Sequence, residues 1–598
     1  MNSTRTLART ALVGLLLAGP AAHAQWQSQS FNLKPGWNAV FLHVDASHAT
    51  LDQLVGADPS NPISEVWMWR PTLSPDRFID NPQQPAAGND WGTWDRSPAE
   101  DTFNTLVPNT AYLVRNSGTA DYVWTVKGVP NLPHYDWNSK GVNFIGFSTP
   151  SVNPPLFANF LVPVPRLASE GQFYRYDDGN NDLIPSLFNG LFNTTRVTRG
   201  QAYWVKHKDN FNRYFGAFDV LLQGTSTIRF REGAGQYGLR LRNNSDESLQ
   251  VTLQVLPSES APAGQKPVAG GVPLLVRGQL NASTLSYSHQ ILDQPYKVTI
   301  APAGTVGSEV EIVLGLNRAA LPGNPGDQAA SVLRFTDSKG FSQVDLGISA
   351  EKQSATGLWV GNASVTDVGH YLKTYQRDGK GQLVTGPLTD KGQSYVATGT
   401  NTSLGKTARP FPLRLILHND DKGNRTLLQR VYVGANLNSN NVVSTKEVGV
   451  LHPQLISQAR RISAPHLPWS ASNEGWPSIE GDLMTGSNLV FKITVDPNNH
   501  AANPFLHTYH PDHDNLNATF DAVQPRGVES YEIQRTIRLS FGAGGTDFAS
   551  LTSAGNQLLG SYEEDIVLLG KNEDQRTIHT QGGFVLNRIS SIPTLTRQ

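Results

Sequence analysis

The sequence contains no cysteine among its 598 residues. This absence excludes a disulfide framework, a cysteine-ligated zinc or iron–sulfur site, a thiol nucleophile and a cysteine-linked lipid anchor. An exported chain without disulfides must draw its stability from large hydrophobic cores. A chain of this length can bury such cores in roughly three to five domains.

Charge and long apolar runs are also scarce. Charged residues make up 16 % of the chain, the formal net charge is −2, and no run of Lys and Arg indicates binding to nucleic acid. No segment approaches about eighteen uninterrupted apolar residues, so we expect no membrane span. The Gly-x-Ser-x-Gly elbow, the P-loop and the Rossmann glycine pattern are missing as well. These absences favour a non-catalytic protein.

The N-terminus reads as a processing segment. Arg5 and Arg9 form a basic start, Ala11–Gly19 is apolar but too short to span a bilayer, and Ala22-His-Ala24 matches an A-x-A cleavage site. The pattern predicts a Sec-type signal peptide over 1–24, cleaved near Ala24/Gln25. We therefore expect a secreted protein that resides in the periplasm, at the cell surface or outside the cell.

The rest of the chain is rich in turn-forming residues, with 54 Gly and 38 Pro. Such a composition is typical of short strands joined by many turns. We predict an all-β fold in which tandem β-modules are followed by an immunoglobulin-like sandwich and a larger C-terminal β-sandwich.

An internal repeat occupies the first third of the chain, with copies that start roughly 105 residues apart. Each copy has a Gly-x-Asn strand, then an aromatic strand, then a turn that leads into Ala-Tyr-(Leu/Trp)-Val. In the first copy these are Gly36-Trp-Asn38, Glu65-Val-Trp-Met-Trp69 and Ala111-Tyr-Leu-Val114, and in the second they are Gly141-Val-Asn143, Gln172-Phe-Tyr-Arg-Tyr-Asp177 and Ala202-Tyr-Trp-Val205.

This repeat resembles a module common in bacterial surface proteins, with the pattern Phe-x-Leu-x-x-Gly-Trp-Asn-Leu and a final Gly-x-(Gly/Ala)-Tyr-Trp-Val. The resemblance covers about 30–207. The first copy departs from the pattern at Asn109, where Gly is usual, and the second has Val142 in place of Trp. The resemblance implies placement and architecture, because no catalytic role accompanies the module. We predict a first module over 25–130 and a second over 131–216.

Two further regions follow the repeat. Period-two strands over 217–352 predict an immunoglobulin-like sandwich. The region 353–598, with Gly357-Leu-Trp-Val-Gly361 and Phe411-Pro-Leu-Arg-Leu-Ile-Leu-His418, resembles the C-terminal region of uncharacterised secreted multidomain β-proteins of environmental bacteria. That resemblance implies no established activity, and we expect a β-sandwich with a His/Asp-rich loop.

The loop is the densest cluster of ligand-type side chains in the chain. The candidate metal ligands are His507, His510, Asp512, His513 and Asp514. Pro504 and Pro511 disfavour a helix there, so these residues belong to a long loop that begins near Asp496. Imidazole with carboxylate suits zinc, and carboxylate with carbonyl oxygen suits calcium. Hydrogen bonding within the loop, a structural divalent metal and a catalytic metal remain alternatives.

Aromatic residues give the second candidate site. Trp67, Trp69, Trp91 and Trp94 of the first module could stack on sugar rings, although such spacing equally suits core and cross-strand packing. The sequence favours a structural or adhesive role at the cell surface or in the extracellular matrix. Other surface proteins, extracellular glycans or further copies of the chain would be its partners. The alternatives are a metal-dependent hydrolase that uses the 496–515 loop and a carbohydrate-binding protein that uses the N-terminal aromatics.

Overall fold

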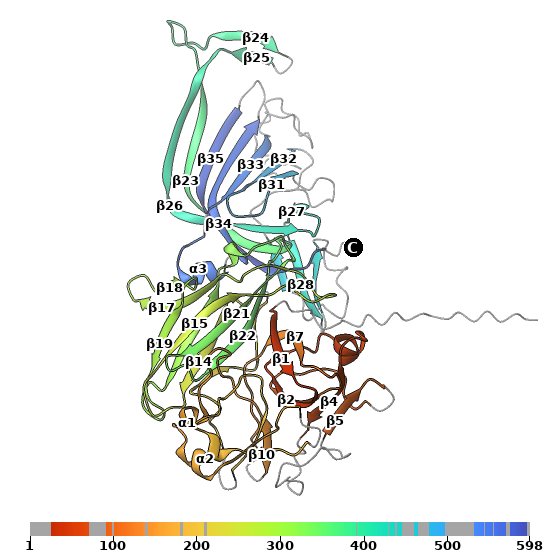
Figure 1. Ribbon diagram of the computed structural model, residues 1–598. Helices are drawn as coiled ribbons and strands as arrows, with labels where there is room; N and C mark the ends of the chain where they lie inside the picture. The colour runs from red at the N-terminus through yellow and green to blue at the C-terminus, as the bar shows by residue number, and fades with distance from the viewer. Residues whose placement is uncertain are drawn as a thin grey trace, which may run out of the picture. The chain divides into compact units, whose positions relative to one another are not determined.

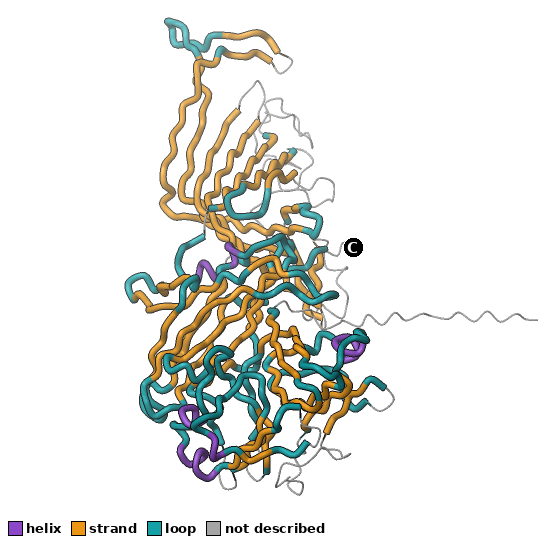
Figure 2. The backbone as a smooth tube through the Cα atoms, in the orientation of Figure 1, coloured by secondary structure: helices purple, strands orange, loops and turns teal. Residues whose placement is uncertain are grey.

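The structure is a computed structural model that describes residues 25–70, 91–97, 101–137, 141–179, 183–207, 212–231, 233–389, 392–428, 430–436, 439–444, 460–463, 478–496, 531–542, 544–553, 555–569 and 575–594. It is all-β with a few short helices, so the predicted fold class is confirmed (Figures 1 and 2). No helix within these ranges is long and apolar enough to cross a membrane. The predicted signal peptide lies outside the described residues.

The chain divides into two compact units, and each is described by itself. The first comprises Met1–Gln279, His289–Leu316 and Ala320–Lys352, and the second comprises the remaining residues. The finer division into two modules and two sandwiches stays a prediction.

The two copies of the repeat fold into sheets with the same strand order. The order is β2-β6-β4-β5 in the first module and β8-β11-β9-β10 in the second. In each sheet the Gly-x-Asn strand pairs with the Ala-Tyr-x-Val strand, which in turn pairs with the aromatic strand. The strands are β2 (Gly36–Leu42), β4 (Ile63–Trp69), β5 (Trp91–Asp95), β6 (Thr110–Asn116), β8 (Val142–Ile145), β9 (Gln172–Arg175), β10 (Ser186–Leu187) and β11 (Tyr203–Lys206).

Other short elements complete each module. A three-stranded sheet with the order β1-β7-β3 belongs to the first module, whereas helices belong mainly to the second. These elements are β1 (Gln27–Leu33), β3 (Val44–Asp45), β7 (Tyr122–Pro130), the π-helix η1 (Asp52–Gly56), α1 (Phe157–Phe160), α2 (Pro165–Glu170) and the 3-10 helix η3 (Asn189–Leu191).

Each Ala-Tyr-x-Val strand is buried on both faces. Because successive side chains of a strand point to opposite faces, Tyr112 and Val114 enter the core of the first module while Ala111 and Leu113 enter a second core. The second module repeats this division. Its Tyr203 lies in its own core, and its Trp204 lies in the same second core as Leu113. One aromatic-rich core is therefore shared by the two modules.

The immunoglobulin-like region packs two sheets around one core. Their strand orders are β12-β14-β20-β17-β18 and β13-β22-β21-β15-β19, with β16 beside β21. The strands are β12 (Phe218–Leu222), β13 (Ile228–Phe230), β14 (Gln236–Asn243), β15 (Leu249–Pro257), β16 (Val268–Gly270), β17 (Leu274–Asn281), β18 (Ser286–Ile291), β19 (Tyr296–Ile300), β20 (Glu309–Leu316), β21 (Gln328–Asp337) and β22 (Gln343–Glu351), and the 3-10 helix η4 (Arg318–Ala320) follows β20.

A single turn of the second module contacts both of its neighbours in the first unit. The Phe41 N–H of the first module donates to the Gly200 carbonyl over 2.7 Å. The adjacent Arg199 donates to the Gln343 carbonyl over 2.9 Å and pairs with Asp345 at 3.4 Å, both in the sandwich. Burial raises the pKa of the Asp345 carboxyl, but the neighbouring guanidinium groups outweigh burial and hold that pKa below its ordinary value. The turn thus joins three regions of the unit.

The second unit is built on one eight-stranded antiparallel sheet with the order β27-β26-β23-β35-β34-β33-β32-β31 (Figure 1). The sheet curves around a single core, and Arg425 beside one edge pairs with Asp482 beside the other. The elements of this unit are β23 (Gly357–Tyr375), β24 (Thr385–Thr389), β25 (Gly392–Tyr395), β26 (Ala397–Asn419), β27 (Arg425–Leu427), β28 (Arg430–Asn436), β29 (Ser439–Ser444), β30 (Arg460–Ser463), β31 (Ser478–Gly481), β32 (Asn488–Val495), β33 (Glu532–Phe541), α3 (Phe548–Ser553), β34 (Gln557–Leu569) and β35 (Gln575–Ser590).

Candidate functional site

The predicted metal ligands lie outside the described residues. His507, His510, Asp512, His513 and Asp514 all fall between 497 and 530, which follows directly on Asp496 at the end of β32. Within the described ranges, no group of three or more His, Asp and Glu side chains lies close enough together to hold a metal ion. The zinc or calcium site at the loop stays a prediction.

The four candidate tryptophans pack inside the first unit. Trp94 is fully buried, and its indole N–H donates to the Asp52 carboxylate over 3.0 Å. Trp67, Trp69 and Trp91 contribute to the shared core, where the Trp69 and Trp91 rings both meet Trp204 edge to face. Sugar binding by these residues stays a prediction, and their observed role is packing.

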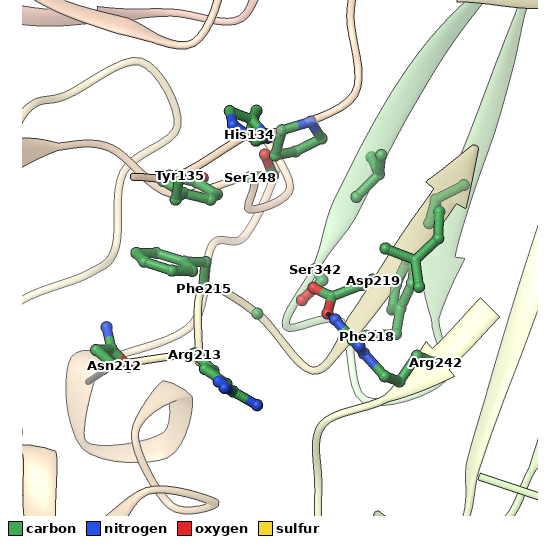
Figure 3. Close-up of a pocket in the computed structure, with 15 residues that line it drawn as sticks. His134, Tyr135, Ser148, Asn212, Arg213, Phe215, Phe218, Asp219, Arg242 and Ser342 are labelled. Carbon is green, nitrogen blue, oxygen red and sulfur yellow. Dashed lines mark hydrogen bonds and ion pairs between the residues drawn. The ribbon is translucent and has the colours of Figure 1, made fainter. Parts of the chain in front are cut away.

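A different site lies between the second module and the sandwich (Figure 3). It is a hollow with a volume of about 300 Å³. Its lining comes from the stretches 133–135 and 212–221, from Ser148, from Arg242 on β14, and from Ser342 and Val344 at the start of β22. Small-molecule sites form preferentially at junctions between domains, where loops of both partners converge.

Two stacked aromatic rings form one wall of this hollow. Tyr135 and Phe215 lie parallel, with ring centroids 3.8 Å apart (Figure 3). The Tyr135 hydroxyl donates to the Gly146 carbonyl over 2.9 Å, which fixes the ring. Burial raises the pKa of this hydroxyl, so it stays protonated and keeps donating. Phe215 therefore rests on a rigid support and remains partly exposed to the hollow.

An ion pair lies in the opposite wall. The Arg242 guanidinium on β14 donates to the Asp219 carboxylate on β12 over 2.8 and 3.2 Å (Figure 3). Both side chains remain partly exposed, at 44 % for Arg242 and 27 % for Asp219. Such a pair adds little to stability. It does place a donor and an acceptor side by side, opposite an aromatic surface.

The described residues of the hollow also include Ser148, Ser342 and His134. The Ser342 hydroxyl oxygen accepts the Ala217 N–H over 2.8 Å, so it is held in a backbone contact. His134 is 83 % exposed and pairs with Asp136 at 3.3 Å. The hollow thus presents an aromatic face together with a paired donor and acceptor.

Sequence reasoning missed this site, because its residues are far apart in the chain and none belongs to a motif. Tyr135 lies near the start of the predicted second module, and Phe215 lies just before the predicted boundary at 216/217. The available signal was an aromatic residue close to each predicted boundary, because connecting segments are usually polar and an aromatic residue there indicates a contact.

Comparisons with known proteins add little. No protein-family model matches the chain, and no curated protein matches it. Among solved structures, the chain is similar to the crystal structure of the Pseudomonas aeruginosa CupB2 chaperone, with 13 % sequence identity over 35 % of this chain and 97 % of that chain. The TM-score of 0.14 is too low for the likeness to carry an argument.

Proposed function

We propose that the chain is an exported bacterial surface or extracellular-matrix protein with an adhesive role, and that the hollow of Figure 3 binds a neutral extracellular glycan. The observation that carries the proposal is the Asp219–Arg242 pair opposite the Tyr135–Phe215 stack, within one hollow. The resemblance of the modules to those of bacterial surface proteins points to the same location. No observation on the described residues favours the hydrolase alternative.

The chemistry of the two walls suits a sugar. A sugar ring has an apolar face of C–H groups, which packs on an aromatic ring, and an edge of hydroxyls that both donate and accept hydrogen bonds. Phe215 offers the aromatic face, and Asp219 and Arg242 offer an acceptor and a donor. Because Asp219 and Arg242 neutralise each other, a neutral polyol can bind both groups, and the exposed Arg213 adds further donors to the lining.

A rigid site loses less free energy when it binds. Phe215 is supported by Tyr135, and the strands that carry Asp219 and Arg242 pair in register within the sandwich sheet. The turn at Arg199 ties the second module to the sandwich, so both walls belong to one compact unit. A ligand therefore has to order few side chains when it binds.

The test is glycan binding by the mature chain, 25–598, measured by glycan array and then by titration calorimetry. We expect binding to neutral glycans, and we expect Phe215→Ala to weaken it about two- to twelvefold, since ring stacking contributes about 0.5–1.5 kcal/mol. Arg240→Ala is the matched control, because Arg240 lies on β14 two residues from Arg242 and pairs with Glu309 but does not line the hollow. No binding to any neutral glycan, or equal losses in both variants, would refute the proposal.

A further inference from the structure

A larger hollow adjoins the one in Figure 3. Its volume is about 760 Å³, and the two hollows share Asn212, Arg213 and Arg242 in their walls. It lies between the start of α2, the end of β11 and the turns of the sandwich at 242–244 and 303–309. Its apolar lining includes Val164, which precedes α2. The shared residues make the two hollows neighbouring parts of one groove.

A buried histidine in this wall has unused hydrogen-bonding capacity. His207 is 3 % exposed and lines the larger hollow. Within the described residues, neither ring nitrogen has a hydrogen-bond partner. The nearest carboxylate, of Glu170, is 3.6 Å from Nε2, which is beyond hydrogen-bonding length. Buried polar atoms are usually paired in folded proteins, and this imidazole can hydrogen-bond to a polar group that enters the hollow.

Arg166, Arg213 and Arg242 line the larger hollow, and Arg166 and Arg242 each lie beside a carboxylate. Arg166 donates to both oxygens of Glu170 over 3.2 Å, and Arg242 faces Glu309 at 3.8 Å. Guanidinium and carboxylate groups are thus interspersed along the groove, as they are in the smaller hollow. A chain of neutral hydroxyl-bearing rings matches this surface, because it supplies donors and acceptors without adding net charge.

We propose that the two hollows form one groove for an internal stretch of a neutral polysaccharide, several sugar units long. This inference rests on the proposed function and specifies its ligand. Ligand sites of about 300–1,000 Å³ hold drug-sized molecules, so the smaller hollow suits roughly one or two rings and the larger one takes those that follow. Phe215 stacks the first ring, and His207 binds a hydroxyl of a later one.

Chain length is the variable that tests the inference. Neutral gluco-, manno- and galacto-oligosaccharides of roughly one, two, four and six units are titrated into the mature chain. We expect affinity to rise at least about tenfold between the shortest and longest members of the binding series, because each further hydrogen bond contributes. Polygalacturonate of matched length is the acidic comparison, and we expect it to bind more weakly.

Two variants test whether the gain in affinity with oligosaccharide length comes from the larger hollow. His207→Phe keeps a planar ring without hydrogen-bonding atoms, and Arg166→Gln, at an exposed side chain, avoids any risk to folding. Both should remove most of the affinity of the longest oligomer and leave that of the shortest unchanged, whereas Phe215→Ala weakens both and Arg240→Ala weakens neither. Binding without dependence on length, or tighter binding of the acidic polymer, overturns the inference and leaves sugar binding itself standing. Absence of binding throughout overturns the proposed function as well.

Discussion

The two repeated modules share their hydrogen bonding and differ in the side chains that face each other. In both, the buried Asn of the Gly-x-Asn strand donates to the carbonyl that ends the Ala-Tyr-x-Val motif, from Asn38 to Val114 and from Asn143 to Val205. In both, the motif Tyr hydroxyl accepts a backbone N–H five residues earlier. The features that hold each module together are thus repeated.

The shared core is where the modules diverge. The first module places Trp37 and Leu113 there, and the second places Val142 and Trp204 at the equivalent positions. Each position therefore combines a large residue in one copy with a small one in the other. If both modules carried the large residue at the same position, the large rings would crowd each other and the small residues would leave a gap. Because the large residue lies at a different position in each module, the two faces fill their common volume at the packing density of a protein interior. Divergence between repeats here reflects packing against each other.

Of the substitutions in the shared core, truncation of Trp204 should have the largest effect on stability. The ring stacks on Phe144 at 4.4 Å, and its N–H donates to the Tyr176 hydroxyl over 3.0 Å. We expect Trp204→Ala to destabilise the protein by about 3–5 kcal/mol, and Leu113→Ala by less, since it removes a smaller side chain. Urea unfolding followed by circular dichroism measures both.

The exposed Val123 supplies the control for these truncations. Its side chain is 63 % exposed, so Val123→Ala should change stability by less than about 0.5 kcal/mol. If Leu113→Ala cost as much as Trp204→Ala, the larger side chain at this pair of equivalent positions would not contribute more to the shared core.

The motif tyrosines Tyr112 and Tyr203 occupy equivalent positions in the two modules but have different hydrogen-bond partners. Tyr112 both accepts the Val107 N–H and donates to the Val107 carbonyl, over 2.8 and 3.1 Å. Tyr203 accepts the Thr198 N–H over 3.2 Å and donates to the Gln201 side chain. Burial raises the pKa of both hydroxyls, so each stays a donor.

Removing these hydroxyls should therefore have unequal effects. Tyr112→Phe leaves two backbone groups without a partner and should cost about 1–3 kcal/mol, whereas Tyr203→Phe leaves one, because Gln201 is partly exposed and can turn to water. Thermal unfolding of the two variants gives the order. If Tyr203→Phe were the more destabilising variant, the hydrogen-bond partners of the two hydroxyls would not explain the difference in stability.

Much of the fold follows from the sequence, and the reason is physical. The all-β class depends on turn-forming composition and on period-two strands, which are local signals. The equivalence of Tyr112 and Tyr203 follows from the repeat, because similar sequences place similar residues at similar positions. Local patterns thus sufficed for the elements and for their order within each module.

The contacts between the modules and the hollow of Figure 3 did not follow. Trp91 lies in the core shared by the modules and Trp94 in the core of the first module, and strand alternation places the two on opposite faces without telling which face meets the other module. The hollow brings Tyr135, Phe215 and Arg242 together from three separate segments. Which segments meet depends on how the second module packs on the sandwich, and no local pattern carries that information.

A pH-dependent difference between the modules comes from His43. When the two Gly-x-Asn strands are aligned in sequence, His43 of the first module corresponds to Ser148 of the second. Burial, and secondarily the charge of Arg199, lower the pKa of His43 well below 6.5. In the folded protein the ring therefore stays neutral at pH values where the unfolded chain takes up a proton. Stability is full above pH 6.5 and falls as pH drops below it, by up to about 1.4 kcal/mol per pH unit from this group.

Substitution of His43 should flatten that dependence. His43→Leu removes the proton uptake of the unfolded chain, so the slope of unfolding free energy against pH should decrease between pH 6.5 and more acidic values. Urea unfolding over a pH series measures the slope. Val123→Ala, which changes an exposed side chain without a titratable group, is the control and should leave the slope unchanged. An identical slope in His43→Leu and the parent protein would exclude this account.

The smallest expected effect concerns the turn before each Ala-Tyr-x-Val strand. Asn109 has a φ of 55° and Gly200 a φ of 85°, so both residues adopt the left-handed conformation, which Asn tolerates and Gly favours. A Cβ on Gly200 would lie 3.0 Å from the Gln29 amide nitrogen and 3.2 Å from the Phe31 ring of the first module. The Asn109 side-chain amide instead donates to the Leu132 carbonyl over 2.8 Å.

Exchanging the two residues separates backbone strain from contact between modules. Asn109→Gly keeps the conformation and loses one hydrogen bond, so it should cost about 0.5–1 kcal/mol. Gly200→Asn keeps the conformation too but crowds the first module, and it should cost more, by about 1 kcal/mol or above. Compared with Asn109→Gly, Asn109→Ala measures the backbone cost of the left-handed conformation, whereas Gly200→Ala combines that cost with the contacts of a Cβ on the first module. If Asn109→Gly and Gly200→Asn proved equal in thermal unfolding, the turn at Gly200 would contribute nothing to the contact between the modules beyond its own conformation.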